Sequence, residues 1–178
     1  VGSGVGVLRL NRPDKRNALN RETIARLRQE LGRADLDAAV RVVVIRGAGK
    51  DFCAGADLKE RAGMTPEQTR TFLRKIRGIM DLVERAPMPT IAAIEGWCIG
   101  GGAALAVACD WRVAADNAFF YVPELKLGMN MSWQSVPRFT HLIGPAKTKQ
   151  LLILAERVDA GTAERWGLFD YLCAPGQA

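Results

Sequence analysis

Short apolar runs rich in β-branched residues recur along the first half of the chain, separated by segments in which apolar residues lie three and four positions apart. The runs over residues 5–10, 41–47 and 90–96 predict strands, and the last two are apolar enough to be buried on both faces. The segments between them predict amphipathic helices. Strands that alternate with helices are typical of an α/β domain.

The first two helices have recognisable start signals. Asn20 is a suitable N-cap for the first helix. Its apolar face is formed by three residues at helical spacing: Ile24, Leu27 and Leu31. A short second helix is predicted after Asp57, which is spaced from Glu60 as in a capping box.

The longest helical segment begins at Thr65. Thr65 caps this helix, Pro66 occupies its first position and Gln68 completes a capping box. Its apolar residues recur at helical spacing: Phe72, Ile76, Ile79, Met80 and Val83. Pro87 and Pro89 end the segment.

The second half of the chain continues the α/β pattern. It predicts strands over 111–115 and 118–122 and then a loop over 123–131. Two shorter helices follow, one after Ser132 and one that starts at Pro145. The chain has no repeat, low-complexity tract or linker, so we expect one domain.

Three consecutive glycines, Gly100 to Gly102, follow the strand over 90–96 and precede a predicted helix over 103–110. Backbone N–H groups at the N-terminus of a helix favour negative charge, and without Cβ atoms they can approach a ligand closely. The glycines are therefore suited to bind a phosphate or a developing oxyanion. Close packing of a helix on a strand favours glycine equally, so the glycines alone do not distinguish a binding site from a packing requirement.

Composition restricts the class of protein. Of the 178 residues 48% are hydrophobic and 25% charged, as expected for one globular domain with a substantial core. No stretch approaches the ~20 apolar residues of a transmembrane helix, and the first residues lack the features of a signal peptide. We expect a soluble intracellular protein with no membrane partner, in the cytoplasm, with the mitochondrial matrix as the alternative. Because the chain opens on Val1, we expect a fragment or a processed product.

Neither a disulfide nor a metal site is expected. The four cysteines form no C-x-x-C pair and have apolar neighbours, so we expect them to be reduced core residues: Cys53, Cys98, Cys109 and Cys173. The carboxylates and the single histidine, His141, form no ligand cluster. A hydrolase that pairs His141 with Ser132 or Ser135 lacks a nucleophile elbow, and an ordinary helix face is the better interpretation of His141.

The formal charge of +6 fits an anionic partner, either nucleic acid or a phosphorylated small molecule. The predicted first helix carries a group of arginines: Arg21, Arg26, Arg28 and Arg33. A solvated helix face explains these arginines as well, so the charge does not choose between the partners.

A second junction has the same form as the glycine junction. Residues 51–60, DFCAGADLKE, lead through small residues into a capped helix, so each junction can donate one N–H to the same oxygen. Four segments carry a family resemblance: LNRPDKRNALN (10–20), FCAGADLKE (52–60), IAAIEGWCIGGGAALAVACDWRVAADNAFF (91–120) and VPELKLG (122–128). They occur in the order of the crotonase, or enoyl-CoA hydratase/isomerase, superfamily, which the chain resembles over nearly its whole length.

The resemblance implies a single domain over 1–178, folded as a crotonase-type spiral of ββα repeats that binds acyl-CoA. The backbone amides of Ala56 and Gly101 would hold the thioester oxygen, with Gly100 beside them, and would stabilise an enolate. No cofactor is implied beyond the coenzyme A of the substrate. Family members usually continue with helices that build a homotrimer or hexamer; those helices are absent here, and we expect such an oligomer from the resemblance alone.

The resemblance also implies a site for the CoA moiety. The backbone around Ala54, Asp57 and Leu58 would cradle its adenine end. Lys59 and Arg16 would lie near its phosphates.

The segment that follows residue 128 departs from the family pattern. Met129, Met131 and Trp133 stand where common hydratases have a glycine-rich loop. Such side chains often pack in cores, but by resemblance Met129 and Trp133 line the acyl pocket. We infer an unusual acyl specificity.

The catalytic residues of the family are only partly present. Hydratases that the chain resembles use two glutamates to hold and activate water; the chain keeps the second as Glu124 and has Ala104 at the first position. A single glutamate can take a proton from one carbon and return it two carbons away, as in the Δ3,Δ2-enoyl-CoA isomerases. We therefore predict double-bond isomerisation, with hydration of a 2-enoyl-CoA as the alternative.

Two further functions stay open. The chain is similar to hydratases of this family that bind AU-rich RNA, and the arginines of the first helix form a basic footprint, although without aromatic residues that could stack on bases. We rank RNA binding below catalysis. Ala104 also leaves room for a non-catalytic acyl-CoA binder.

Overall fold

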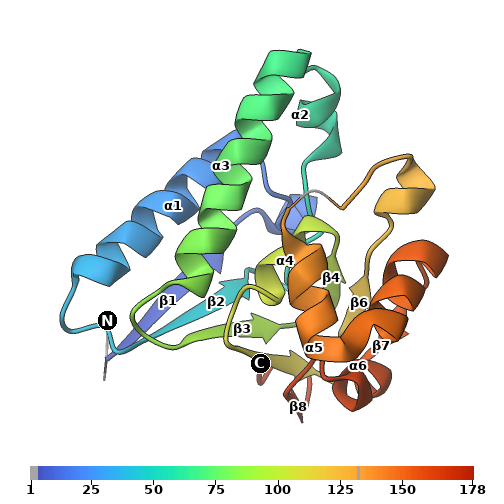
Figure 1. Ribbon diagram of the computed structural model, residues 1–178. Helices are drawn as coiled ribbons and strands as arrows, with labels where there is room; N and C mark the ends of the chain where they lie inside the picture. Colours follow the sequence, from blue (N-terminus) through green and yellow to red (C-terminus); the bar gives the residue numbers. More distant parts are fainter. Residues whose placement is uncertain (1–3, 132) are drawn as a thin grey trace.

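The computed structural model describes residues 4–131 and 133–178 and contains two sheets (Figure 1). The larger sheet is parallel, with the order β1-β2-β3-β5-β8. Its strands are β1 (Val5–Leu10), β2 (Val42–Gly47), β3 (Thr90–Ile94), β5 (Trp111–Ala115) and β8 (Tyr171–Cys173). The smaller sheet, β4-β6-β7, consists of β4 (Trp97–Ile99), β6 (Phe119–Tyr121) and β7 (Val158–Asp159), with β7 antiparallel to β6.

The chain moves between the two sheets as it advances. β3 and β5 pair in the larger sheet, and the strands that follow them, β4 and β6, pair in the smaller one. Isolated bridges extend the second layer toward the N-terminus, from Cys98 to Cys53 and from Ala56 to Leu19. A strand, a short second strand or bridge and then a helix therefore repeat along the chain. This is the expected ββα spiral, and the predicted α/β class is confirmed.

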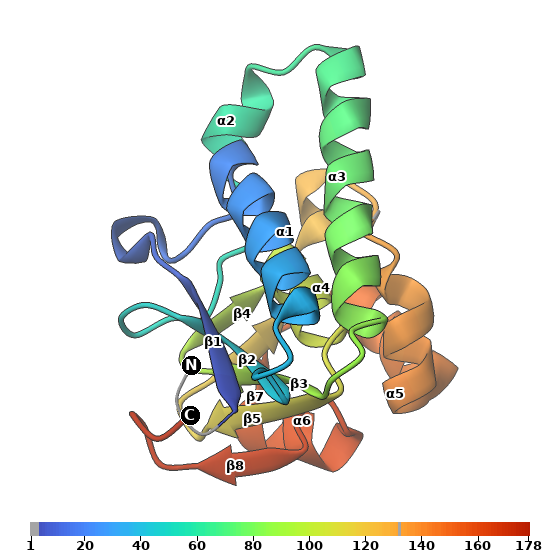
Figure 2. The same cartoon turned by 90° about the vertical axis from the view of Figure 1, so that its left-hand side faces the viewer.

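Six α-helices accompany the sheets in the described part of the chain. They are α1 (Arg21–Leu36), α2 (Leu58–Ala62), α3 (Pro66–Glu84), α4 (Gly101–Ala106), α5 (Ser135–Lys149) and α6 (Ala160–Trp166). Shorter turns are the 3₁₀ helices η1 (Pro13–Lys15) and η2 (Glu124–Leu127) and the π-helical turn η3 (Gln150–Leu154). Figures 1 and 2 both show α1 and α3 packed side by side, rising away from the strands.

Two of the three predicted N-cap motifs are confirmed in full. The Asn20 side chain accepts the N–H of Thr23 at 2.8 Å, and Thr65 and Gln68 form the reciprocal capping box. Asp57 caps α2, but the predicted box with Glu60 is wrong. The Glu60 carboxylate instead accepts two hydrogen bonds from Arg21, both at 2.9 Å, because α1 begins next to α2.

Other differences follow from tertiary context. The glycines follow β4 rather than the strand over 90–96, and α4 begins at Gly101 and ends at Ala106, short of the predicted 103–110. β2 is not buried on both faces, since its residues alternate between buried and partly exposed. By contrast, the two predicted C-terminal helices are both present within α5: Gly144 has a non-helical backbone with φ of 72°, and a second helical segment begins at Pro145, as predicted. Ser132 lies outside the described residues. The elements over 158–173 were not predicted.

The described cysteines are free thiols, and Cys53, Cys98 and Cys109 are buried. Burial raises the pKa of the Cys53 and Cys109 thiols to about 12, so they stay protonated at neutral pH. Cys173 is partly buried on β8. The prediction of core positions is therefore confirmed for Cys53, Cys98 and Cys109 but not for Cys173. Within residues 4–131 and 133–178, no helix is both long enough and apolar enough to cross a membrane.

Arg112 fastens β8 to the rest of the larger sheet. Its guanidinium pairs with Asp170 at 2.6 Å and donates to the carbonyl oxygens of Leu168 and Cys109 at 3.0 and 2.9 Å. The Arg112 side chain is 3% exposed, and Leu168 and Cys109 are buried as well, so no water can replace Arg112 at their two carbonyl oxygens.

Replacing Arg112 with methionine should therefore lower the free energy of unfolding by about 3 kcal/mol, because buried acceptors and a carboxylate lose their partner. Urea denaturation followed by circular dichroism measures the change. Arg33→Gln is the control, since Arg33 forms an exposed pair with Glu30 and its loss should change stability by less than about 1 kcal/mol. Equal effects of the two substitutions would contradict the role of Arg112.

Candidate active site

The two predicted strand-to-helix junctions, the segment over 51–60 and the glycine run over 100–102, lie in direct contact. The N–H of Ile99 donates to the carbonyl of Cys53 at 3.0 Å, and the N–H of Cys53 donates to the carbonyl of Trp97 at 2.9 Å. A Cβ placed on Gly55 would lie 2.9 Å from the backbone nitrogen of Gly101. The start of α4 therefore rests against the backbone of the segment that leads into α2.

Each of the three positions in the glycine run requires glycine because of a different neighbour. Gly100 has φ of 52°, and a Cβ there would lie 2.6 Å from Oε1 of Glu124. A Cβ on Gly101 would overlap the indole of Trp133, and one on Gly102 would overlap the carbonyl oxygen of Cys53. Only glycine allows all three close approaches.

Two backbone N–H groups at this contact have no acceptor in the described part of the chain. Leu19 donates to Gly55 at 2.7 Å and accepts from Asp57 at 3.0 Å, so the N–H of Ala56 between them points away from this bridge. The N–H of Gly101 belongs to the first turn of α4, where helical geometry supplies no partner. The geometry is suited to two donors for one oxygen.

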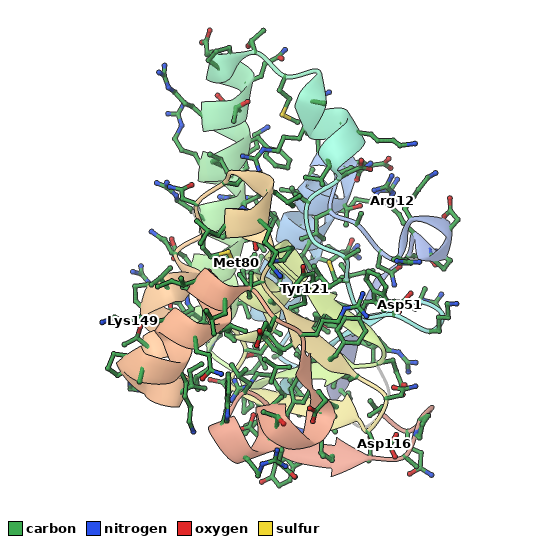
Figure 3. The ribbon with its side chains drawn as sticks, turned by 90° about the vertical axis from the view of Figure 1, so that its right-hand side faces the viewer. Arg12, Asp51, Met80, Asp116, Tyr121 and Lys149 are labelled. Carbon is green, nitrogen blue, oxygen red and sulfur yellow. The ribbon has the colours of Figure 1, made fainter. Side chains whose placement is uncertain are left out.

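Glu124 places its carboxyl group against this pair of junctions. Pro123 and Glu124 follow β6, whose last residue, Tyr121, lies in the middle of the molecule in Figure 3 and accepts the N–H of Gly100 at 2.8 Å. Oε2 of Glu124 is buried and has no hydrogen-bond partner among the described residues. Burial raises the pKa of Glu124, and the positive charge of Arg61 partly offsets this shift.

A second carboxylate is absent where a two-glutamate site would need one. The corresponding position on α4 is Ala104, which is fully buried. Glu124 is thus the one acidic side chain that the described structure places against the glycine run. The arrangement can accept and return a proton through one group.

The residues proposed for the CoA moiety surround the first junction. The N–H of Ala54 donates to the carbonyl of Arg16 at 2.9 Å, while Leu58 and Lys59 are exposed on α2. The Arg16 guanidinium lies 3.9 Å from the centroid of the Trp97 ring, so it stacks on an aromatic face.

Asp57 has a structural role at the start of α2. Its carboxylate pairs at 3.0 Å with Arg12, which is labelled in Figure 3, and it caps α2. Burial works against the charge of Asp57, but the Arg12 hydrogen bond and the backbone N–H groups of α2 lower its pKa.

The acyl-pocket candidates lie next to Gly101 and Glu124. The Trp133 side chain is buried, with 5% exposure, on Gly101, and the N–H of Met129 donates to the carbonyl of Glu124 at 2.9 Å. Sequence reasoning missed Arg61, whose Nη1 lies 3.1 Å from Sδ of Met129. No local signal distinguishes Arg61 from a solvated helix residue, because its partner comes from a distant segment.

The remaining candidates that the structure describes lie on α5 and α1. His141 is exposed on α5 and Ser135 is buried at the start of that helix, whereas Ser132 lies outside the described residues. No three His, Cys, Asp or Glu side chains of the described residues are grouped to hold a metal. Three α1 arginines pair with carboxylates, Arg21 with Glu60, Arg26 with Glu22 and Arg33 with Glu30. RNA binding stays a prediction.

A model of one protein family, described as enoyl-CoA hydratase/isomerase, matches residues 1–177. The chain is 37% identical over 175 residues to enoyl-CoA hydratase domain-containing protein 2, mitochondrial, of Mus musculus, covering 98% of this chain and 59% of the relative. It is also 37% identical over 172 residues to the crotonyl-CoA hydratase of Syntrophomonas wolfei, covering 96% and 66%. The chain therefore spans less than two thirds of the length of these relatives.

The fold is similar to that of solved structures. The crystal structure of an enoyl-CoA hydratase from Bacillus anthracis matches with a TM-score of 0.94 and 39% identity, over 96% of this chain and 67% of that one.

The contact between Gly102 and Cys53 predicts the effect of adding one methyl group. Gly102→Ala should lower the free energy of unfolding by about 1–3 kcal/mol, because the methyl group meets rigid backbone. Gly32→Ala is the matched control: a Cβ at Gly32 of α1 meets nothing within 4 Å, so stability should rise by up to about 1 kcal/mol. Chemical denaturation of both variants measures the difference, and equal shifts would contradict the close contact.

The burial of Glu124 predicts a stability change with pH. A raised carboxyl pKa means that folding favours the protonated form, so the wild type loses this contribution as pH rises through the raised pKa. Glu124→Gln should therefore have a higher Tm than the wild type at pH 7 and no advantage below the ordinary glutamate pKa. Thermal unfolding between pH 4 and 8 measures the difference, and an advantage that does not change with pH would contradict it.

Proposed function

The chain belongs to the enoyl-CoA hydratase/isomerase family, and on that premise we propose that it isomerises 3-enoyl-CoA thioesters to 2-enoyl-CoA with Glu124 as the only base. The observation that carries this proposal is the buried Oε2 of Glu124, which has no partner among residues 4–131 and 133–178. It lies beside two N–H groups that have no acceptor in the same part of the chain, and Ala104 stands in place of a second glutamate.

In the proposed reaction the thioester oxygen accepts hydrogen bonds from the N–H groups of Ala56 and Gly101. Glu124 removes a proton from C2, and the electron pair of that C–H bond delocalises over the double bond and the thioester oxygen as a dienolate. The protonated Glu124 then donates the same proton to C4, which leaves the double bond between C2 and C3. The two amides act only on charge that develops during the reaction, so they stabilise the transition state more than the substrate.

The environment of Glu124 suits both halves of this exchange. A carboxylate with a raised pKa is a stronger base than an exposed one, and its conjugate acid is still acidic enough to protonate a dienolate. Trp133 covers Gly101 and limits the access of water to the dienolate.

The CoA moiety would lie along the first junction. We place its adenine end against the backbone of Ala54, Asp57 and Leu58, and its phosphates near Lys59 and Arg16. Coenzyme A is then part of the substrate. Assembly into a homotrimer or hexamer stays a prediction of the family resemblance.

Hydration of a 2-enoyl-CoA is the second candidate. It is favoured by the names of the similar proteins, since the mouse, Syntrophomonas and Bacillus relatives are all called hydratases. In that reaction Glu124 would have to activate water without the second carboxylate that Ala104 replaces.

An ultraviolet assay separates the candidates. We expect a 3-enoyl-CoA to gain the absorbance of a conjugated thioester, and Glu124→Gln to reduce the rate by about 10³-fold, because general base catalysis is lost. Lys126→Gln is the control, since Lys126 is an exposed neighbour on η2. Loss of absorbance from a 2-enoyl-CoA would instead identify a hydratase, and no reaction with either thioester, despite binding, would favour an acyl-CoA binder.

A further inference from the structure

Arg61 brings a positive charge to the catalytic region without a carboxylate to neutralise it. Its Nη1 lies 3.1 Å from the Met129 thioether, and within the described residues it forms no ion pair. A thioether sulfur is a weak acceptor, so the five N–H donors of the guanidinium are largely unused by the protein. The side chain is partly buried, which strengthens its interaction with any anion that reaches it.

The position of Arg61 associates it with the acyl end of the site. Met129 donates its N–H to the carbonyl of Glu124, and the charge of Arg61 acts on the Glu124 carboxyl group. Lys59, proposed to lie near the CoA phosphates, precedes Arg61 by two residues on α2. Two residues correspond to about 200° around a helix, so Lys59 and Arg61 face nearly opposite sides.

We propose that the site selects acyl-CoA substrates whose acyl chain ends in a second carboxylate, and that Arg61 binds this carboxylate beside Met129. A carboxylate can accept two parallel charge-assisted hydrogen bonds from a guanidinium, which neither a methyl group nor Met129 can replace. Arg61 thus determines substrate specificity, while Glu124 performs the proton transfer. This inference rests on the proposed binding of acyl-CoA at Glu124.

A phosphate of the CoA moiety is the alternative anion for Arg61. If Arg61 instead binds a phosphate of the CoA moiety, its loss weakens every CoA thioester and free CoA to the same degree. If it acts only on the charge of Glu124, its loss changes the rate with all substrates and leaves relative binding unchanged. Affinities for matched thioesters distinguish these cases, because only a bound acyl carboxylate makes the affinity depend on the chain terminus.

The experiment uses isothermal titration calorimetry with saturated thioesters, which contain no double bond to isomerise or hydrate. Hexanedioyl-CoA and hexanoyl-CoA form one pair, and pentanedioyl-CoA and pentanoyl-CoA a shorter pair. For the wild type we expect the diacid thioester of at least one pair to bind about 10-fold more tightly than its monoacid partner. Arg61→Gln should abolish this preference, and Arg61→Lys should retain part of it because the charge remains.

Arg33→Gln is the charge-matched control, since it also removes one positive charge, from a distant end of α1, and should keep the full preference. Equal affinity for both members of each pair in the wild type, or a preference that survives Arg61→Gln, would overturn the inference while leaving the proposed function intact. Failure of every thioester to bind would overturn the proposed function, and this inference with it. Circular dichroism of each variant establishes that the fold is retained.

Discussion

The close approach of two backbone segments, residues 53–55 and 99–102, is the constraint on which the rest of the site depends. Two hydrogen bonds join Cys53 to Trp97 and Ile99, and the absence of a Cβ at Gly102 lets α4 begin directly against the Cys53 carbonyl. The ββα spiral produces this contact, because successive turns place their second strands in one layer. Among the residues that the structure describes, no acceptor is bonded to the N–H groups of Ala56 and Gly101 at this contact.

The same packing fixes the environment of Glu124. β6 pairs with β4, so the residues after β6 return to the start of α4, and Oε1 of Glu124 comes close to the Cα of Gly100. Oε2 is thereby buried, and no described residue donates a hydrogen bond to it. Burial of the ionised carboxylate lowers the stability of the folded protein, and the raised pKa of Glu124 reflects the same free-energy cost. A buried carboxylate with a free oxygen has a chemical rationale when that oxygen takes a proton from the substrate.

How far the sequence predicts this molecule depends on how local each signal is. The Thr65 capping box was predicted because all its atoms lie within one helical turn. The similar box at Asp57 and Glu60 fails because Arg21, 39 residues away, competes successfully for the Glu60 carboxylate. β4 has only three residues and its partner strand comes later in the chain, so periodicity gave no sign of it. Arg61 was missed for the same reason, since Met129 lies 68 positions further on.

The diacid specificity proposed for Arg61 would also affect the chemistry of Glu124. Burial raises the pKa of Glu124, whereas a hydrogen bond from its own backbone and, to a smaller extent, the charge of Arg61 lower it. An acyl carboxylate bound by Arg61 would neutralise that positive charge, so the pKa of Glu124 would rise further when a diacid thioester is in place. Glu124 would then be a stronger base with a diacid thioester than with a monoacid thioester, whose binding leaves the charge of the guanidinium uncompensated. The positive charge of Arg61 would thus lower the basicity of Glu124 while no anion is bound, and binding of an acyl carboxylate would restore it.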